Sequence, residues 1–230
     1  MSTGSVVPEA RPRAESEWIE LPCCPDAHAW ALARDVQELV HFTLHNNLIG
    51  ILASGYLKSK YRAERDEQVE HVYLPNAPGR SRDYEWIDYA NLSVTRINSW
   101  LFGSSKNRWH QDSSWVVLSF DPIILSHPGV VFATTNNAYP ECRRAEGLSG
   151  LQRLFDDPVV AYNGRRSTRS GLPLNRSTDQ GAEVLYPGQL SIEYLRRIYV
   201  QTEHAFDDVH GVCAGIGLSI EIAHEPTMFS

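Results

Sequence analysis

Short runs of β-branched and aromatic residues, bounded by Gly, Pro or Asp, dominate the second half of the chain and constrain its fold more than any other feature. Runs of this kind are typical of β-strands. They predict strands at residues 115–120, 130–135, 158–162, 182–186, 198–201 and 217–223. Two further strands are expected in the first half, at 39–43 and at 89–95. A fold built from this sequence must therefore bury at least one β-sheet.

Apolar residues at helical spacing occur mainly before these strands. They predict a helix from about 26 to 39, with Asp26 as its cap. A second helix is expected after Asn46, and Gly55 fits the left-handed position that closes such a helix. Because helices come early and strands come late, we expect an α+β fold.

The segment 58–86 is charged and contains Pro and Gly, so we expect a long loop there with one short strand piece at 69–74. Arg96 is expected to open a short helix. The 230 residues are enough for one sizeable core. We expect a flexible N-terminal tail at 1–17 and a single domain at 18–230.

The net charge of −7 counts against a protein that coats duplex DNA through bulk positive charge. A local basic stretch remains, made of Arg165, Arg166, Arg169 and Arg176. The sequence has no apolar run long enough for a spanning helix and no signal-peptide core, so we expect a cytoplasmic protein without a membrane partner. None of the four cysteines forms a CxxC pair, which predicts free thiols and no metal site.

Glu183 is the most informative carboxylate, because it lies on an expected strand directly after a long polar stretch at about 163–180. A polar loop of that length in a compact domain is usually functional or disordered. On the strand, Glu183 shares a face with Leu185. An inward carboxylate is costly unless it is paired or used. The alternative is an edge strand on which Glu183 meets water.

Two further sets of polar residues are candidates for ligand binding. His41 and Thr43 lie on one face of their strand while Phe42 points into a core, so the pair could grip a ribose. The alternative is that both are hydrogen-bonded locally at a strand end. Arg96 lies at a strand-to-helix transition that suits a phosphate, although a surface ion pair would place it there equally well.

In order along the chain, these segments together resemble a known family. The segments are His41-Phe42-Thr43 with Asn47-Leu48, Ile51-Leu52 and Gly55-Tyr56-Leu57, then Tyr89-Ala90-Asn91-Leu92-Ser93 through Arg96, and finally Ala182-Glu183-Val184-Leu185. They resemble the DarT-type bacterial toxins, which are DNA ADP-ribosyltransferases of toxin–antitoxin systems. The resemblance implies an ADP-ribosyltransferase fold, with two small, roughly crossed β-sheets, flanking helices and an NAD cleft between the sheets.

The resemblance also implies roles for particular residues. His41 and Thr43 would hold the ribose and nicotinamide side of NAD, the co-substrate, and Asn47 would line the same pocket. Arg96 would approach the phosphates and the reacting end. Glu183 would be the catalytic glutamate, and the loop at about 163–180 would recognise the acceptor.

The chain departs from the family pattern at two places that concern the acceptor. Many relatives carry Gln two positions before the glutamate, where this chain has Gly181, with Gln180 one place further back. The segment 91–96 resembles the branch that modifies guanine more than the aromatic-rich branch that modifies thymidine. We therefore expect transfer of ADP-ribose to a base, guanine rather than thymine, in single-stranded DNA.

The acceptor base must leave a stack to react, and an aromatic side chain could hold it. The candidates for that contact are Tyr139, Trp109 and Tyr162. The resemblance implies one protein partner, a cognate antitoxin that removes ADP-ribose or blocks the site. The alternatives are an ADP-ribosyltransferase directed at RNA or protein, an RNA 2′-phosphotransferase, a catalytically silent NAD-binding module, and a purely structural adaptor.

Overall fold

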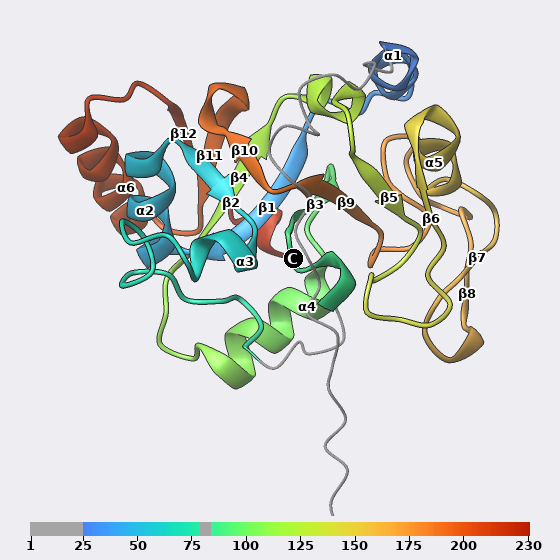
Figure 1. The fold of residues 1–230 in the computed structure, drawn as a ribbon, viewed down its shortest axis with the longest axis horizontal. Helices are drawn as coiled ribbons and strands as arrows, with labels where there is room; N and C mark the ends of the chain where they lie inside the picture. Colours follow the sequence, from blue (N-terminus) through green and yellow to red (C-terminus); the bar gives the residue numbers. More distant parts are fainter. Residues whose placement is uncertain (1–24, 79–83) are drawn as a thin grey trace, which may run out of the picture.

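The computed structural model describes residues 25–78 and 84–230, and its central feature is an eight-stranded sheet (Figure 1). The strand order is β12-β11-β4-β1-β3-β9-β5-β6. The bounds are β1 Leu39–Leu44, β3 Tyr89–Val94, β4 Trp115–Phe120, β5 Val131–Ala133, β6 Arg144–Glu146, β9 Glu183–Pro187, β11 Leu195–Val200 and β12 Glu221–His224. The expected tail at 1–17 lies outside the described residues, and the single-domain boundary at residue 18 stays a prediction.

The sheet divides into two halves at the contact between β1 and β3. These strands pair only at Leu39↔Val94 and Val40↔Ser93, whereas β1 pairs with β4 along its whole length. Beyond Val40, β3 leaves β1 and pairs with β9 through residues 89–92. The halves β12-β11-β4-β1 and β3-β9-β5-β6 therefore diverge from a short seam. The expected α+β fold with two small sheets is confirmed.

Two smaller ribbons and six helices complete the described part of the chain. The ribbons pair β2 (Tyr56–Lys58) with β10 (Gln189–Ser191), and β7 (Val159–Val160) with β8 (Arg166–Ser167). The helices are α1 Pro25–Ala33, α2 His45–Ser54, α3 Lys60–Ala63, α4 Ser99–Ser104, α5 Gly147–Arg153 and α6 Glu203–Ile216. Figure 1 places α2 and α6 at the β11–β12 end of the sheet and α5 at the β5–β6 end. None of these helices is long and apolar enough to cross a membrane.

Strand β4 explains how the sheet separates two cores. All six of its residues are buried. Because successive side chains of a strand point to opposite faces, Val116 and Leu118 enter the large core with α1, α2, α5 and α6, while Trp115 enters a smaller aromatic core. In that smaller core the rings of Phe42 and Phe102 meet edge to face with centroids 5.5 Å apart. His41 and Thr43 are left on the opposite face of β1.

Several sequence-based boundaries were wrong for local reasons. Helix α1 ends at Ala33, because the chain turns at Asp35, whose φ is +59°, before β1 begins. The segment 69–74 forms turns and no strand. Arg96 does not open α4; Asn98 caps that helix by accepting a hydrogen bond from the Leu101 N–H at 3.0 Å.

The late helix α6 was missed altogether. Its 14 residues run from the Thr202 cap to Gly217, whose φ of +78° closes the helix as Gly55 closes α2. Only Val209 and Cys213 of this helix are buried. Ala205, Phe206 and Val212 pack partly buried beside them, so the helical spacing of this apolar face was present in the sequence and was overlooked.

Candidate active site

A pocket of about 500 Å³ occupies the space where β1 and β3 diverge. Its walls come from β1, α2, β2, α3, the segment 69–78 and β3, and Glu183 lines it from the start of β9. Pockets for small molecules and cofactors generally measure about 300–1,000 Å³. A dinucleotide therefore fits this space by size.

Glu183 is a buried carboxylate on a central strand. β9 lies between β3 and β5, with Glu183 opposite Ala133, and only 3% of Glu183 is exposed. The edge-strand alternative is therefore excluded. The Asn137 N–H donates to Glu183 Oε2 at 2.9 Å, and Asn136 Nδ2 lies 3.4 Å from Oε1. These donors fix the carboxylate in one orientation on the side of the pocket.

His41 enters the same pocket from β1 as a neutral imidazole. Its Nδ1 lies 2.7 Å from the Asn91 carbonyl oxygen, and because a carbonyl can only accept, Nδ1 must carry the hydrogen. Burial lowers the pKa of His41, outweighing that hydrogen bond, which raises it. Nε2 therefore keeps its lone pair and can accept a hydrogen bond from a sugar hydroxyl.

Thr43 and Asn47 line the pocket, but their polar atoms hold one of its walls in place. Asn47 Nδ2 donates to Thr43 Oγ1 at 3.0 Å and to the Leu74 carbonyl at 2.8 Å, while its Oδ1 accepts from the Leu74 N–H at 2.8 Å. Asn76 Nδ2 donates to the Phe42 carbonyl at 2.6 Å. These bonds tie the segment 74–76 to β1 and α2. The main role of Thr43 and Asn47 in this structure is therefore to hold the shape of the pocket.

Arg96 is the one predicted site residue that the structure places apart. It is not among the residues that line the pocket. Its Nη1 donates to the Thr227 carbonyl at 2.6 Å and lies 3.6 Å from Met228 Sδ. The guanidinium thus holds the C-terminal turn η7 (Pro226–Phe229), which packs through Phe229 on Phe102 of α4. Its expected contact with phosphate stays a prediction that this geometry does not support.

Basic residues line the other end of the pocket. Lys58, Lys60 and Arg65 all contribute to the lining. Lys58 pairs with Asp66, and this hydrogen bond lowers the pKa of that carboxyl. β9 carries the chain about 14 Å from Glu183 to Pro187, at ~3.4 Å per residue, before β10 pairs with β2 beside Lys58. Glu64 also lines this end and lies 3.7 Å from Lys60 Nζ, so the end away from Glu183 keeps only a small excess of positive charge.

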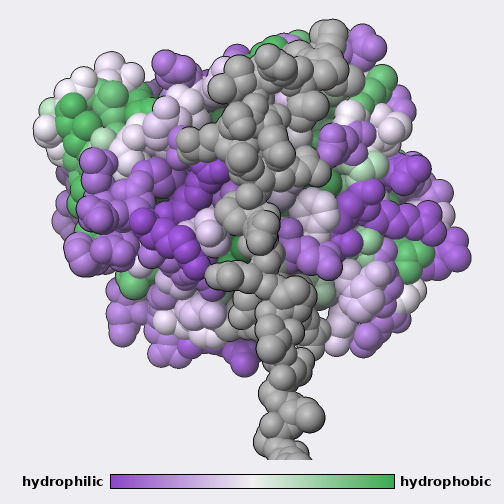
Figure 2. Space-filling view, in the orientation of Figure 1, coloured by the Kyte–Doolittle hydropathy of each residue, from purple (hydrophilic) through white to green (hydrophobic). Residues whose placement is uncertain are grey.

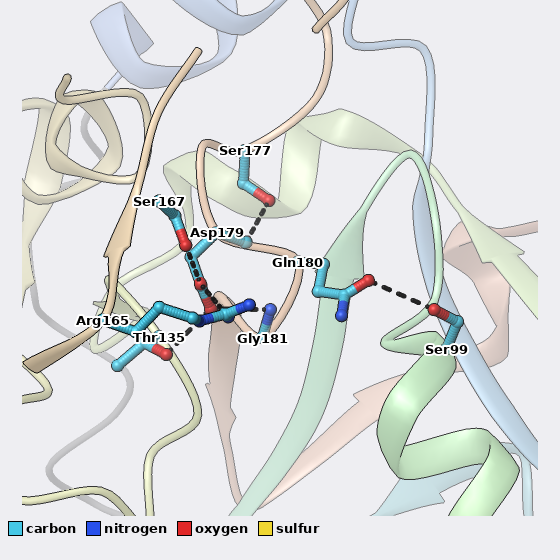
Figure 3. A network of polar contacts seen from close by, with 8 residues as sticks. All are labelled: Ser99, Thr135, Arg165, Ser167, Ser177, Asp179, Gln180 and Gly181. Carbon is cyan, nitrogen blue, oxygen red and sulfur yellow. Dashed lines mark hydrogen bonds and ion pairs between the residues drawn. The ribbon is translucent and has the colours of Figure 1, made fainter. Parts of the chain in front are cut away.

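The segment before Glu183 is fixed by a second buried carboxylate, that of Asp179 (Figure 3). Its oxygens accept hydrogen bonds from Thr135 Oγ1 at 2.8 Å, from Ser167 Oγ at 2.6 Å and from the Gly181 N–H at 2.9 Å. A Cβ at Gly181 would lie 2.9 Å from Asp179 Oδ1, so the network leaves no room for the Gln that many relatives carry there. The amide of Gln180 instead accepts a hydrogen bond from Ser99 Oγ at 3.2 Å.

The part of the chain that the structure describes offers no set of side chains suited to bind a metal ion. Residues 25–78 and 84–230 contain no cluster of three or more His, Cys, Asp or Glu side chains that could hold an ion. Cys142 and Cys213 are free and buried, and burial raises the pKa of both thiols. Neither thiol is suited to act as a nucleophile.

Residues 40–230 match the family described as ssDNA thymidine ADP-ribosyltransferase, DarT. The chain belongs to the DarT family. This membership confirms the resemblance seen in the sequence, and with it the class of enzyme. A search of curated proteins found no match.

Solved structures of DarT proteins share the fold at low sequence identity. Thermus sp. 2.9 DarT in complex with ADP-ribosylated ssDNA is 13% identical, with a TM-score of 0.65 over 85% of this chain and 97% of that one. The same protein in complex with NAD⁺ is 14% identical, with a TM-score of 0.60 over 85% of this chain and 98% of that one. Thermosipho africanus DarTG in complex with ADP-ribose is 15% identical, with a TM-score of 0.56 over 84% of this chain and 51% of that one.

The DarT family description names thymidine, whereas the sequence analysis favoured guanine. The guanine preference has no support in these comparisons. It rested on the segment 91–96, of which Asn91 and Ser93 line the pocket from β3. Those positions share the pocket with His41 and Glu183, so they do not by themselves identify the acceptor base.

The residues that hold Glu183 were missed in the sequence. Asn136 and Asn137 lie 47 and 46 positions before it, and Arg144 donates through Nε and Nη2 to the Asn137 side chain and carbonyl. Their one sequence signal is the run of polar residues at 134–137 directly after a buried strand. Such a run can be recognised as part of a site only once the strand opposite it is known.

Proposed function

We propose that this chain cleaves NAD and transfers the ADP-ribose to a base of single-stranded DNA. One observation carries the proposal: the buried Glu183 carboxylate faces a dinucleotide-sized pocket that the neutral His41 also lines. Membership of the DarT family supports both the reaction type and the acceptor. Relatives of the same fold bind NAD⁺ and ADP-ribosylated ssDNA, which supports the choice of reactants.

The chemical step requires stabilisation of a cationic sugar. When the bond between ribose C1′ and the nicotinamide nitrogen breaks, both bonding electrons leave with nicotinamide, and positive charge develops on C1′. A fixed carboxylate near the ribose lowers the energy of that charge more than it lowers the energy of the ground state. Glu183 would also accept a hydrogen bond from the ribose 2′-hydroxyl, in the orientation that Asn136 and Asn137 impose.

The second half of the step forms the new glycosidic bond. A nitrogen of the base attacks C1′ and loses its proton, which Glu183 is placed to accept. The products are nicotinamide, ADP-ribosylated DNA and one proton. A water molecule in place of the base would give free ADP-ribose, so the acceptor side must exclude water.

The charge distribution of the pocket orients NAD. The nicotinamide ribose belongs at the acidic end, beside Glu183. Lys58, Lys60 and Arg65 at the opposite end would neutralise the pyrophosphate, in place of Arg96. His41 Nε2 would accept a hydrogen bond from a ribose hydroxyl. Thr43 and Asn47 would act on NAD indirectly, by holding the segment 74–76 that forms one wall.

The decisive experiment measures transfer to oligonucleotides of restricted composition. The purified protein is incubated with NAD and single strands that contain thymidine but no guanine, or guanine but no thymidine, and a mass gain of one ADP-ribose is sought. The family description favours transfer to the thymidine strands. Transfer confined to the guanine strands would restore the original expectation. Parallel RNA and protein pools report the other acceptors.

A matched pair of variants tests the role of the carboxylate. Glu183→Gln keeps the shape and removes the charge, and we expect transfer to fall by about 10²–10³. Glu193→Gln makes the same change at an exposed position and should leave the rate unchanged. Calorimetry with NAD checks that the Glu183→Gln variant still binds. A Glu183→Gln rate equal to wild type, or no transfer to any nucleic acid by the wild type, would end the proposal.

A DNA-modifying activity of this kind makes the chain a toxin in the cytoplasm. We propose a cognate antitoxin that removes ADP-ribose from DNA. Expression of the wild type should arrest growth, Glu183→Gln should not, and co-expression of an ADP-ribose-removing hydrolase should restore growth. Arrest that is equally severe with Glu183→Gln would show that toxicity has another cause.

A further inference from the structure

Trp100 is the most exposed tryptophan of residues 25–78 and 84–230, with 58% of its surface accessible. It stands on α4 between two residues, Asn98 and Leu101, that line the pocket. Trp buries much of its surface on average, so an indole this exposed, on a helix whose neighbouring residues line a pocket, indicates a contact surface. No other aromatic ring of the described residues stacks on it.

The guanidinium of Arg165 lies over the indole of Trp100, with its central carbon 4.5 Å from the ring centroid. The same guanidinium donates from Nη2 to Asp179 Oδ2 at 3.2 Å. The Arg165 side chain is 45% exposed, so this ion pair contributes little stability, whereas Asp179 is almost completely buried. The ion pair instead fixes the direction of the guanidinium.

The pair of Trp100 and Arg165 is rigidly connected to the reacting carboxylate. Figure 3 shows Arg165 and Ser167 converging on Asp179, and Gln180 reaching Ser99 on α4. Asp179 precedes Glu183 by four residues, and Ser99 is the neighbour of Trp100. The stacking surface therefore has a defined position relative to the acceptor side of the site.

Charge and chemistry together identify what this surface can bind. An indole and a guanidinium both offer flat faces to a nucleobase, and Arg165 brings positive charge to this surface in a chain whose net charge is −7. On the face seen in Figure 2, the side that carries β7 and β8 is largely hydrophilic. Such a surface suits a single strand whose bases are unstacked.

We propose that Trp100 and Arg165 form a stacking platform for the nucleotide next to the target base in single-stranded DNA. The inference rests on the proposed function, because it deepens the account of the acceptor. It differs from the sequence-based candidates: Tyr139 and Tyr162 contact each other at 4.9 Å between centroids. Asp179 is a positioning residue in this arrangement, since it acts through Arg165.

Trp100→Ala should raise the KM for oligonucleotide about tenfold, the loss of roughly one stacked base, with an unchanged affinity for NAD. Trp100→Phe should recover most of the loss, and Arg165→Lys should show part of it. Trp109→Ala tests the alternative, because Trp109 was a candidate for the acceptor base in the sequence and is also an exposed indole beside an arginine, Arg108. It should behave as wild type.

Oligonucleotides with an abasic site on either side of the target provide a second test. One of these two positions should weaken wild-type transfer and binding by about the same factor as Trp100→Ala, and should have no added effect in that variant. An abasic penalty that persists in full in Trp100→Ala, or a KM for DNA that the substitution leaves unchanged, would overturn the platform.

Fluorescence anisotropy of labelled oligonucleotides measures the platform without the reaction. Trp100→Ala should weaken binding about tenfold, and Trp109→Ala should not. Wild-type protein that binds single strands through Trp100 but transfers nothing would refute the proposed function alone. Wild-type protein that transfers ADP-ribose with no dependence on Trp100 would refute the platform alone.

Discussion

Replacement of Asn47 by Leu gives the sharpest test of how the pocket is built. The two side chains are similar in size, so the change removes hydrogen bonds with little loss of volume. Three bonds disappear: the two from Nδ2 to Thr43 Oγ1 and to the Leu74 carbonyl, and the one from the Leu74 N–H to Oδ1. Both backbone groups of Leu74 lose their partner at once.

The size of the effect follows from the exposure of each group. A typical intramolecular hydrogen bond contributes about 0.5–1.5 kcal/mol net, so three bonds give roughly 1.5–4.5 kcal/mol. Leu74 is 42% exposed, which allows water to replace part of what its backbone loses. We therefore expect the free energy of unfolding of Asn47→Leu to fall by about 2 kcal/mol. The affinity for NAD should fall by about tenfold or more, because the segment 75–78 lines the pocket and loses its anchor.

Urea denaturation and calorimetry with NAD measure the two effects separately. Asn107→Leu is the control, because it introduces the same side chain at an exposed position that makes no side-chain hydrogen bond among those the structure describes. Thr43→Val removes one of the three bonds and should give an intermediate loss of stability. An Asn47→Leu protein with the urea midpoint and NAD affinity of wild type would refute the claim that this amide holds the wall.

Three further predictions concern the site. Burial lowers the pKa of His41 below its ordinary 6.5, so the folded protein binds this proton less readily than the unfolded chain does. The contribution of neutral His41 to the free energy of unfolding is therefore complete above about pH 6.5 and is lost as the pH falls below that value. NAD affinity, measured by calorimetry across this range, should fall on the acid side, and His41→Gln should remove that fall. Lys60→Gln should weaken NAD binding several-fold, whereas Arg96→Lys should leave it unchanged. If calorimetry gave the reverse result, phosphate binding would be assigned to Arg96. Gly181→Ala should destabilise the protein by about 1–3 kcal/mol in urea, because the new Cβ would lie 2.9 Å from Asp179 Oδ1, and an unchanged midpoint would show that this segment yields freely.

The sequence predicted those parts of the fold that depend on local pattern. Strand β1, the left-handed Gly55 and the inward direction of Glu183 follow from residue alternation, backbone freedom and the cost of burying a carboxylate. Helix α6 was also open to prediction, because Phe206, Val209 and Cys213 recur at helical spacing between a Thr cap and a closing Gly.

The site was predicted in part, since contacts between distant segments leave no local trace. Asn137 reaches Glu183 across 46 positions, and Thr135 reaches Asp179 across 44. The exposure of Trp100 depends on how α4 is docked, which no local pattern in the sequence reports. Arg96 was placed with phosphate because its type and position suit one, but its partner lies 131 residues away at the C-terminus.

The seam between β1 and β3 consists of two residue pairs, so the relative orientation of the two half-sheets depends on a short contact. His41 belongs to one half-sheet and Glu183 to the other, and four residues joined in two pairs are the shared edge of these halves. Bending the molecule at that edge would separate the histidine proposed to hold the sugar from the carboxylate proposed to activate it, while both halves stayed folded. An inhibitor that separates the two half-sheets at this edge would inactivate the enzyme without occupying the pocket.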